Sequence, residues 1–210
     1  SLGSSDGRSA NAGALNGHDK ISYGNGLFVT NSSWGAYNAA YSTDGTSWTA
    51  SSLPVNQGYP VNFYGNGYFV LAASGATNVL YSANGTSWSQ VSIGNTFNRT
   101  DGAYGNGKYV IVGTGQTYNY SSNLTTWTSG TLPLTGDWRI AYGNGTFVAL
   151  GYGTRQIIYS YDGIYWNLAN TKVDYALNWT GLKYANGRFI ASVYSGGGSA
   201  YSLDGINWYS

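Results

Sequence analysis

Short apolar segments alternate with turn residues along the chain, and the stretch from residue 137 to residue 170 shows this pattern most clearly. Between Phe147 and Leu150 every residue is apolar, which is typical of an inner strand covered on both faces. The last segment of each unit instead carries Thr, Ser and Asn around one tryptophan, so we expect it to be the most solvated strand. The pattern predicts four short strands here, over residues 138–142, 146–150, 156–160 and 165–168.

Two motifs mark the turns between such strands. The tyrosine motif is Tyr-Gly-Asn-Gly, with Tyr-Ala-Asn-Gly in its last copy, and the tryptophan motif is Ser-x-Asp-Gly-x-x-Trp. Asn-Gly and Asp-Gly tolerate a positive φ at both central positions of a hairpin turn, so both motifs predict tight strand reversals. The tyrosine motif begins at Tyr23, Tyr64, Tyr104, Tyr142 and Tyr184. The tryptophan motif ends at Trp48, Trp88, Trp127, Trp166 and Trp208.

Both motifs recur five times, at intervals of 38 to 42 residues. A strand-rich repeat of about 40 residues is typical of a propeller blade. We therefore predict an all-β fold, a five-bladed β-propeller with four antiparallel strands in each blade. The blades are expected over residues 19–55, 60–96, 99–132, 137–170 and 178–210. Residues 1–18 are expected to form an N-terminal arm or linker from a longer protein, because the chain starts without methionine.

Composition excludes several classes of function. Only 8% of the residues are charged, the net charge is +1 and glutamate is absent, so no nucleic-acid partner is expected. No apolar run is long enough to predict membrane insertion. The chain has no cysteine and only one histidine, His18, so we expect neither a metal site nor a cofactor.

The tryptophan motif resembles the Asp-box, or bacterial neuraminidase repeat, which occupies the outer hairpin of a propeller blade. Residues 42–48, 160–166 and 202–208 match it with one residue fewer between Asp and Gly. The second copy has Asn84 in place of Asp, and the copy that ends at Trp127 lacks the Asp-Gly pair. Together with the tyrosine motif, the repeat is similar to those of bacterial surface and secreted proteins and of phage tail proteins. The segment 12–18 also looks like linker segments of phage tail fibres.

The Asp-box resemblance suggests a sialidase, but the residues argue against an enzyme. A sialidase pairs its tyrosine nucleophile with a glutamate, which this chain lacks, and it uses six blades. A glycoside hydrolase with an aspartate-only site is the alternative, with two acids meeting across the central channel. Those acids would come from Asp19, Asp101, Asp137 and Asp174. Their competing role is local, as turn caps or as ion-pair partners of Lys20, Arg99 and Arg139.

Carbohydrate binding requires exposed aromatic rings beside polar groups that orient the sugar. The loops that vary between repeats are expected on one face of the propeller, and they carry such residues. Each aromatic side chain there has an alternative role as a plug over the core. The candidate ligand-binding residues are Trp34, Tyr37, Asn78, Arg99, Asp101, Tyr118, Asp137, Trp138, Arg139, Tyr152, Arg155, Tyr175, Trp179 and Tyr194.

The sequence therefore predicts a recognition module without catalytic residues. Its expected partner is a cell-surface glycan or another receptor, bound at the tip of a phage tail fibre or by a bacterial adhesin. The expected location is extracellular or on the virion surface, within a fibre or larger oligomer. Two alternatives remain open at this point, the aspartate-only hydrolase and a structural propeller that mediates protein assembly.

Overall fold

The computed structural model describes residues 18–32, 39–55, 57–152, 156–171, 179–193 and 198–209. These residues form strands and turns, and none of them lies in a helix. Within them, no helix is long and apolar enough to cross a membrane. The chain divides into two compact units, Ser1–Arg99 and Thr100–Ser210, and each is described by itself.

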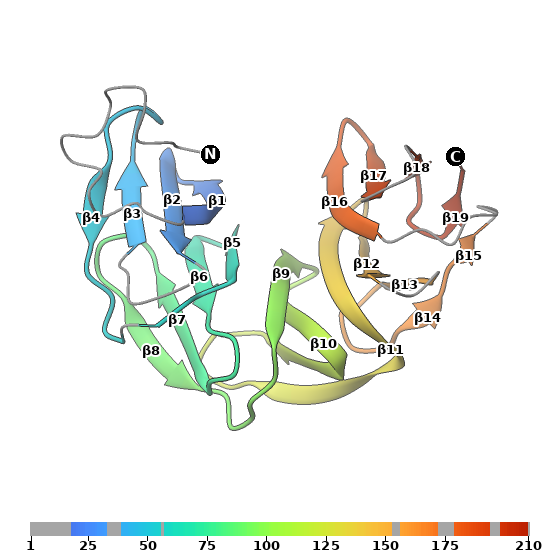
Figure 1. Ribbon diagram of the computed structural model, residues 1–210, viewed down its shortest axis with the longest axis horizontal. Coiled ribbons are helices and arrows are strands. Elements are labelled where there is room, and N and C mark those ends of the chain that lie inside the picture. The colour runs from blue at the N-terminus through green and yellow to red at the C-terminus, as the bar shows by residue number, and fades with distance from the viewer. Residues whose placement is uncertain are drawn as a thin grey trace. The chain divides into compact units, whose positions relative to one another are not determined.

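The first unit holds two antiparallel sheets, each of four strands in chain order (Figure 1). The first sheet consists of β1 (His18–Gly24), β2 (Leu27–Ser32), β3 (Ala39–Ser42) and β4 (Thr49–Ser51). The second consists of β5 (Val61–Gly65), β6 (Tyr68–Ala72), β7 (Asn78–Ser82) and β8 (Ser89–Ser92). Strand β6 is buried along most of its length, whereas β8 is mostly exposed, as the pattern of apolar residues predicts.

The second unit is dominated by one six-stranded sheet in the order β14-β13-β12-β11-β10-β9. Its strands are β9 (Arg99–Gly105), β10 (Lys108–Ser121), β11 (Thr128–Gly143), β12 (Thr146–Tyr152), β13 (Ile157–Ser160) and β14 (Asn167–Leu168). A three-stranded sheet follows, made of β16 (Trp179–Ala185), β17 (Arg188–Val193) and β18 (Ser199–Ser202). The last strand, β19 (Asn207–Trp208), pairs in parallel with β15 (Asn170–Thr171) and reaches β18 through a bridge between Tyr201 and Tyr209.

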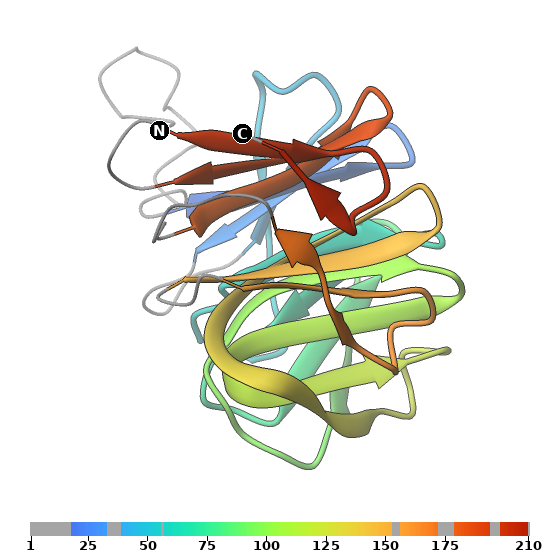
Figure 2. The ribbon, with the colours of Figure 1, turned by 90° about the vertical axis from the view of Figure 1, so that its right-hand side faces the viewer.

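The structure corrects the predicted blade count from five to four. The third and fourth repeats share the six-stranded sheet, because β11 joins the last strand of one repeat to the first strand of the next without a break. Strand β11 bends along its length and stays paired with β10, first at Thr131 with Thr117 and then at Asp137 with Thr114 (Figure 2). Residues 114–118 and 137–139, predicted to be loops, therefore lie within strands.

The tyrosine motif forms the tight turn that the sequence predicts. In all five copies its asparagine has a positive φ, between 43° and 49°. The following glycine also has a positive φ in each copy. A left-handed conformation at two successive residues matches the right-handed twist of the flanking strands, which explains the Asn-Gly pair.

The tryptophan motif is held by one set of hydrogen bonds. The Asp204 Oδ1 atom accepts from the backbone N–H groups of Ile206 and Asn207, both at 2.8 Å, and from the Ser202 hydroxyl at 2.9 Å. The Trp208 Nε1–H group then donates to the Gly205 carbonyl at 3.1 Å. Side-chain acceptors of this kind replace the backbone pairing that a turn interrupts.

The third copy keeps this geometry although its sequence has diverged. Ser121 accepts from the Leu124 N–H group at 2.9 Å, and Asn123 Oδ1 accepts from Thr125 and Thr126 at 3.0 and 2.9 Å. Leu124 takes the left-handed conformation that glycine adopts elsewhere, with φ of 67°. The motif is therefore residues 121–127, with Asn and Leu in place of Asp and Gly.

Candidate recognition site

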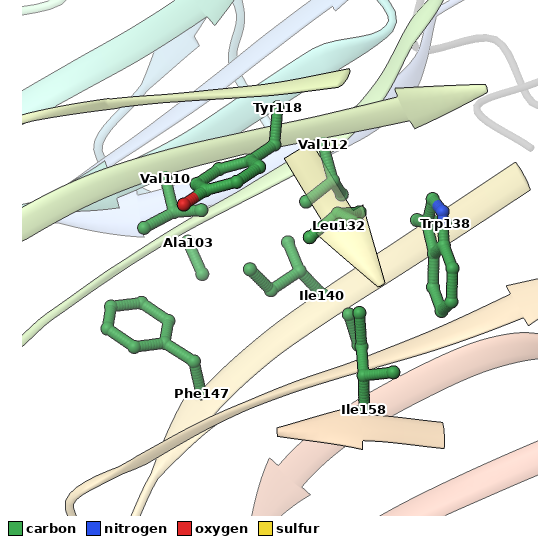
Figure 3. Packing of buried hydrophobic residues seen from close by; sticks show 10 residues of the cluster. Ala103, Val110, Val112, Tyr118, Leu132, Trp138, Ile140, Phe147 and Ile158 are labelled. Atoms are coloured by element: carbon green, nitrogen blue, oxygen red, sulfur yellow. The ribbon is translucent and has the colours of Figure 1, made fainter. Parts of the chain in front are cut away.

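Two of the predicted ligand-binding aromatics belong to the core of the second unit. Trp138 is fully buried in the middle of β11, and its Nε1–H group donates to the Gly115 carbonyl at 2.9 Å. The buried Tyr118 hydroxyl donates to the Ile164 carbonyl at 2.6 Å, and burial raises the pKa of Tyr118 to about 12. Both rings lie among aliphatic side chains of β9 to β13 (Figure 3). Their competing role as core residues is the one that the structure shows.

Trp179 and Arg99 are also buried. Trp179 lies in the cluster between β12 and the last three-stranded sheet. The Arg99 guanidinium donates to the carbonyls of Ala73, Ala76 and Asn95. Burial lowers the pKa of Arg99 to about 10, and its guanidinium lies 4.8 Å from the centre of the Phe97 ring. Arg99 therefore ties the loop between β7 and β9 to the sheet, and a ligand does not reach it.

Two further candidates have local partners. Asn78 is half-buried at the start of β7, where its Oδ1 atom accepts from Gln90 at 3.0 Å. The two carboxylate oxygens of Asp101 accept from the N–H groups of Gly102 and Ile140, at 3.0 and 3.1 Å. Asp101 thus caps backbone groups of β9 and β11, which is the local role that the sequence left open.

Five candidates lie outside the described residues, namely Trp34, Tyr37, Arg155, Tyr175 and Tyr194. Of the four acids considered for a hydrolase, Asp174 also lies outside them. Within the described part of the chain, no three His, Cys, Asp or Glu side chains gather where they would hold a metal ion.

The remaining candidates come together at the ends of β10, β11 and β12. Asp137 is paired with Thr114 on one side and with Tyr152 on the other, so the three residues form a row across three strands. Residues directly opposite in an antiparallel sheet project to the same face, with Cβ atoms about 5 Å apart. We call these three residues, together with Arg139, the recognition row.

Arg139 completes this row. It lies two residues after Asp137 on β11 and therefore on the same face of the strand. Its Nη1 atom is 3.0 Å from Asp137 Oδ1 and also donates to the Trp138 carbonyl. The two side chains are 28% and 33% exposed, and Tyr152 is 42% exposed. The charged pair is therefore oriented by the sheet and still open to solvent.

The row combines the chemical groups that recognise sugars. The Tyr152 ring offers an apolar face, Asp137 and Arg139 offer charged acceptors and donors, and Thr114 adds a hydroxyl. Sequence analysis singled out three of these residues and missed Thr114. The signal that could have found it was continuity of strand-forming residues from 108 to 121, which places Thr114 opposite Asp137.

Comparisons with known proteins agree on the fold. No family model and no curated protein matches the chain. A solved structure of YCF48 bound to D1 peptide is similar over 91% of this chain and 65% of its own, with 15% identity and a TM-score of 0.67. A streptogramin B lyase is similar over 84% of this chain, with 13% identity and a TM-score of 0.72. The fold is an all-β propeller.

A third similar structure is the GH74 enzyme of Niastella koreensis, which matches over 91% of this chain with 20% identity and a TM-score of 0.64. The chain spans 65%, 62% and 31% of the lengths of these three proteins. Their titles name a peptide complex, a lyase and a glycoside hydrolase. Propellers host unrelated functions, so these similarities establish the architecture and leave the activity to the residues of the site.

Proposed function

We propose that this propeller is a non-enzymatic recognition module and that its recognition row binds carbohydrate displayed on a cell surface. The observation that carries the proposal is the alignment of an exposed tyrosine with an oriented Asp137–Arg139 pair across neighbouring strands. In the described residues, these are the unrepeated candidates that combine exposure with mutual contact.

The chemistry of each group supports this assignment. A sugar ring presents C–H groups on one face, and these pack against an aromatic side chain such as Tyr152. Asp137 accepts hydrogen bonds from sugar hydroxyls, and Arg139 donates to hydroxyls or to a carboxylate on an acidic sugar. Since the ion pair already orders both side chains, less conformational entropy is lost on binding.

A site this small gives modest affinity, so display in many copies would raise the avidity. The resemblance of the repeats to phage tail and bacterial surface proteins favours such a setting. We therefore propose an extracellular or virion location, at the tip of a tail fibre or in an adhesin.

The hydrolase alternative is less well supported by the described acids. Asp101 accepts backbone hydrogen bonds at both oxygens, and Asp137 is paired with Arg139. An inverting or retaining pair needs one carboxyl that stays protonated as the acid. Neither aspartate shows an environment that would hold a proton, because one faces N–H donors and the other a guanidinium.

A glycan array with the purified chain tests the proposal. We expect the wild type to bind a restricted set of glycans and Tyr152→Ala to lose at least about tenfold in affinity, since one aromatic contact contributes about 1 kcal/mol or more. Tyr165→Ala is the matched control, because Tyr165 is an exposed tyrosine on the tryptophan motif of the same unit. Absence of glycan binding, or equal binding by wild type and Tyr152→Ala, would refute this function. A peptide array run in parallel shows whether the ligand is a peptide instead.

A further inference from the structure

Neighbouring repeats pack through one recurring contact. The glycine after the signature tyrosine lies directly under the tyrosine ring of the next repeat. A Cβ atom at Gly24 would meet the Tyr64 ring at 2.3 Å, and one at Gly143 would meet the Tyr184 ring at 2.1 Å. Gly105 has the same relation to Tyr142. Each of these contacts requires glycine, because no Cβ atom fits under the ring.

A second contact accompanies the first. The glycine of the tryptophan motif packs against the second strand of the preceding repeat, as Gly205 does against Val148 and Gly163 against Val110. The covered residue is fully buried at both places. Each repeat therefore has a donor face, which carries the tyrosine, and an acceptor face, which carries the glycine of the tyrosine motif and the buried valine.

The fifth repeat has an altered acceptor face. Alanine stands at position 185, where the other four repeats have glycine, and it is exposed. Ile190, which corresponds to the buried valines, is 45% exposed. Two cations, Lys183 and Arg188, lie exposed on the same two strands, and the Arg188 guanidinium is 5.9 Å from the centre of the Tyr201 ring. Charged residues on a sheet surface and a Cβ atom under the seat of a ring both oppose the addition of another blade.

The first repeat keeps an unaltered donor face. Tyr23 is 59% exposed and Ile21 is 56% exposed, whereas the other four signature tyrosines are half-buried. The residues equivalent to Ile21 in the fourth and fifth repeats, Ile140 and Leu182, are buried. The face therefore presents the apolar groups of a blade contact without the cover that the equivalent groups have in those repeats.

We propose that the Ile21–Tyr23 face of the first repeat docks a blade of the chain's own repeat type that has glycine after its tyrosine, and that Ala185 prevents the fifth repeat from being that partner. The fit follows from the contacts already seen within the chain, where the same tyrosine position meets glycine at Gly24, Gly105 and Gly143. Two copies of the wild-type chain should consequently not join head to tail.

Transplanting the acceptor face tests this proposal. The variant Lys183→Ala, Ala185→Gly, Arg188→Thr gives the fifth repeat the residues of the fourth, which are Ala141, Gly143 and Thr146. Sedimentation velocity and thermal unfolding are measured on this triple variant, on the wild type, and on the triple variant with Tyr23→Ala added. The single variant Ala185→Val serves as the control that keeps the seat blocked.

We expect the triple variant to self-associate at least tenfold more strongly than the wild type, and Tyr23→Ala to abolish the gain. Engagement within one copy would instead raise the melting temperature of a monomer by an amount that depends on Tyr23, and it supports the same assignment. A triple variant that neither associates nor gains stability overturns the proposal. An association that persists after Tyr23→Ala, or that the wild type already shows, also overturns it.

Discussion

At the residue scale, the tryptophan motif shows which part of a repeat is chemically required. Asp204 and Asn123 make equivalent hydrogen bonds through Oδ1, so the turn needs an acceptor oxygen at this position and not a negative charge. The sequence predicted the role of the aspartates but not the survival of the turn at Asn123–Leu124. A non-glycine residue in the left-handed region is rare, and no local pattern announces it.

The charge nevertheless makes stability depend on pH. Burial tends to raise the pKa of Asp204, but hydrogen bonds from the backbone and side chain of Asn207 and from Ile206 lower it to about 2, from 3.8. Because the folded state binds this proton more weakly than the unfolded state, the free energy of unfolding should fall as the pH drops from about 5 to 2. The carboxyl is mostly exposed, so we expect a contribution of about 1 kcal/mol after solvent screening.

Two substitutions at Asp204 separate charge from hydrogen bonding. Asp204→Asn should keep the free energy of unfolding at pH 7 within about 1 kcal/mol of the wild type and should remove this part of the pH dependence. Asp204→Ala should lose about 1–2 kcal/mol at pH 7, because two N–H groups lose their acceptor. Denaturant unfolding at both pH values measures the difference, and equal losses for the two variants would contradict the assigned role.

At the scale of elements, the sequence placed the strands well and the breaks between them less well. Turns follow from Asn-Gly pairs, which constrain the backbone locally, and these predictions are confirmed at all five tyrosine motifs. Whether a variable stretch becomes a loop or extends a strand depends on the neighbouring strand. Residues 114–118 extend β10 because β11 continues beside them, with Trp138 and Tyr118 filling the core below. No periodicity in the sequence distinguishes an aromatic residue that points inward from one that points outward.

Hydrogen exchange tests the continuity of β10 and β11. Amides within residues 113–118 and 131–137 should exchange slowly, because the two strands are paired at Thr114 with Asp137 and at Thr117 with Thr131. Residues 52–55, which lie outside the strands of the first unit, should exchange rapidly and serve as the reference. Equal, rapid exchange in all three segments would mean that two separate blades with loops between them, as the sequence predicted, describe this region better.

At the scale of the whole molecule, repeated and unrepeated residues have different roles. Repeated residues make the turns and the contacts between blades, such as Tyr184 over Gly143. Unrepeated residues divide again, since Trp138 and Trp179 join the core while Tyr152 and the Asp137–Arg139 pair stay exposed. The sequence identified the unrepeated set, but only the packing of the strands selects from it the residues that are able to meet a ligand.

Glycan binding and thermal unfolding, measured together on Tyr184→Ala and Tyr152→Ala, test this separation most directly. Tyr184→Ala removes a blade contact, so it should lower the free energy of unfolding by about 2–3 kcal/mol and leave binding by the folded protein unchanged. Tyr152→Ala should leave that free energy within about 0.5 kcal/mol and abolish binding. If Tyr152→Ala unfolds the protein while it still binds glycans, or if Tyr184→Ala loses binding with unchanged stability, the division between scaffold and site is wrong.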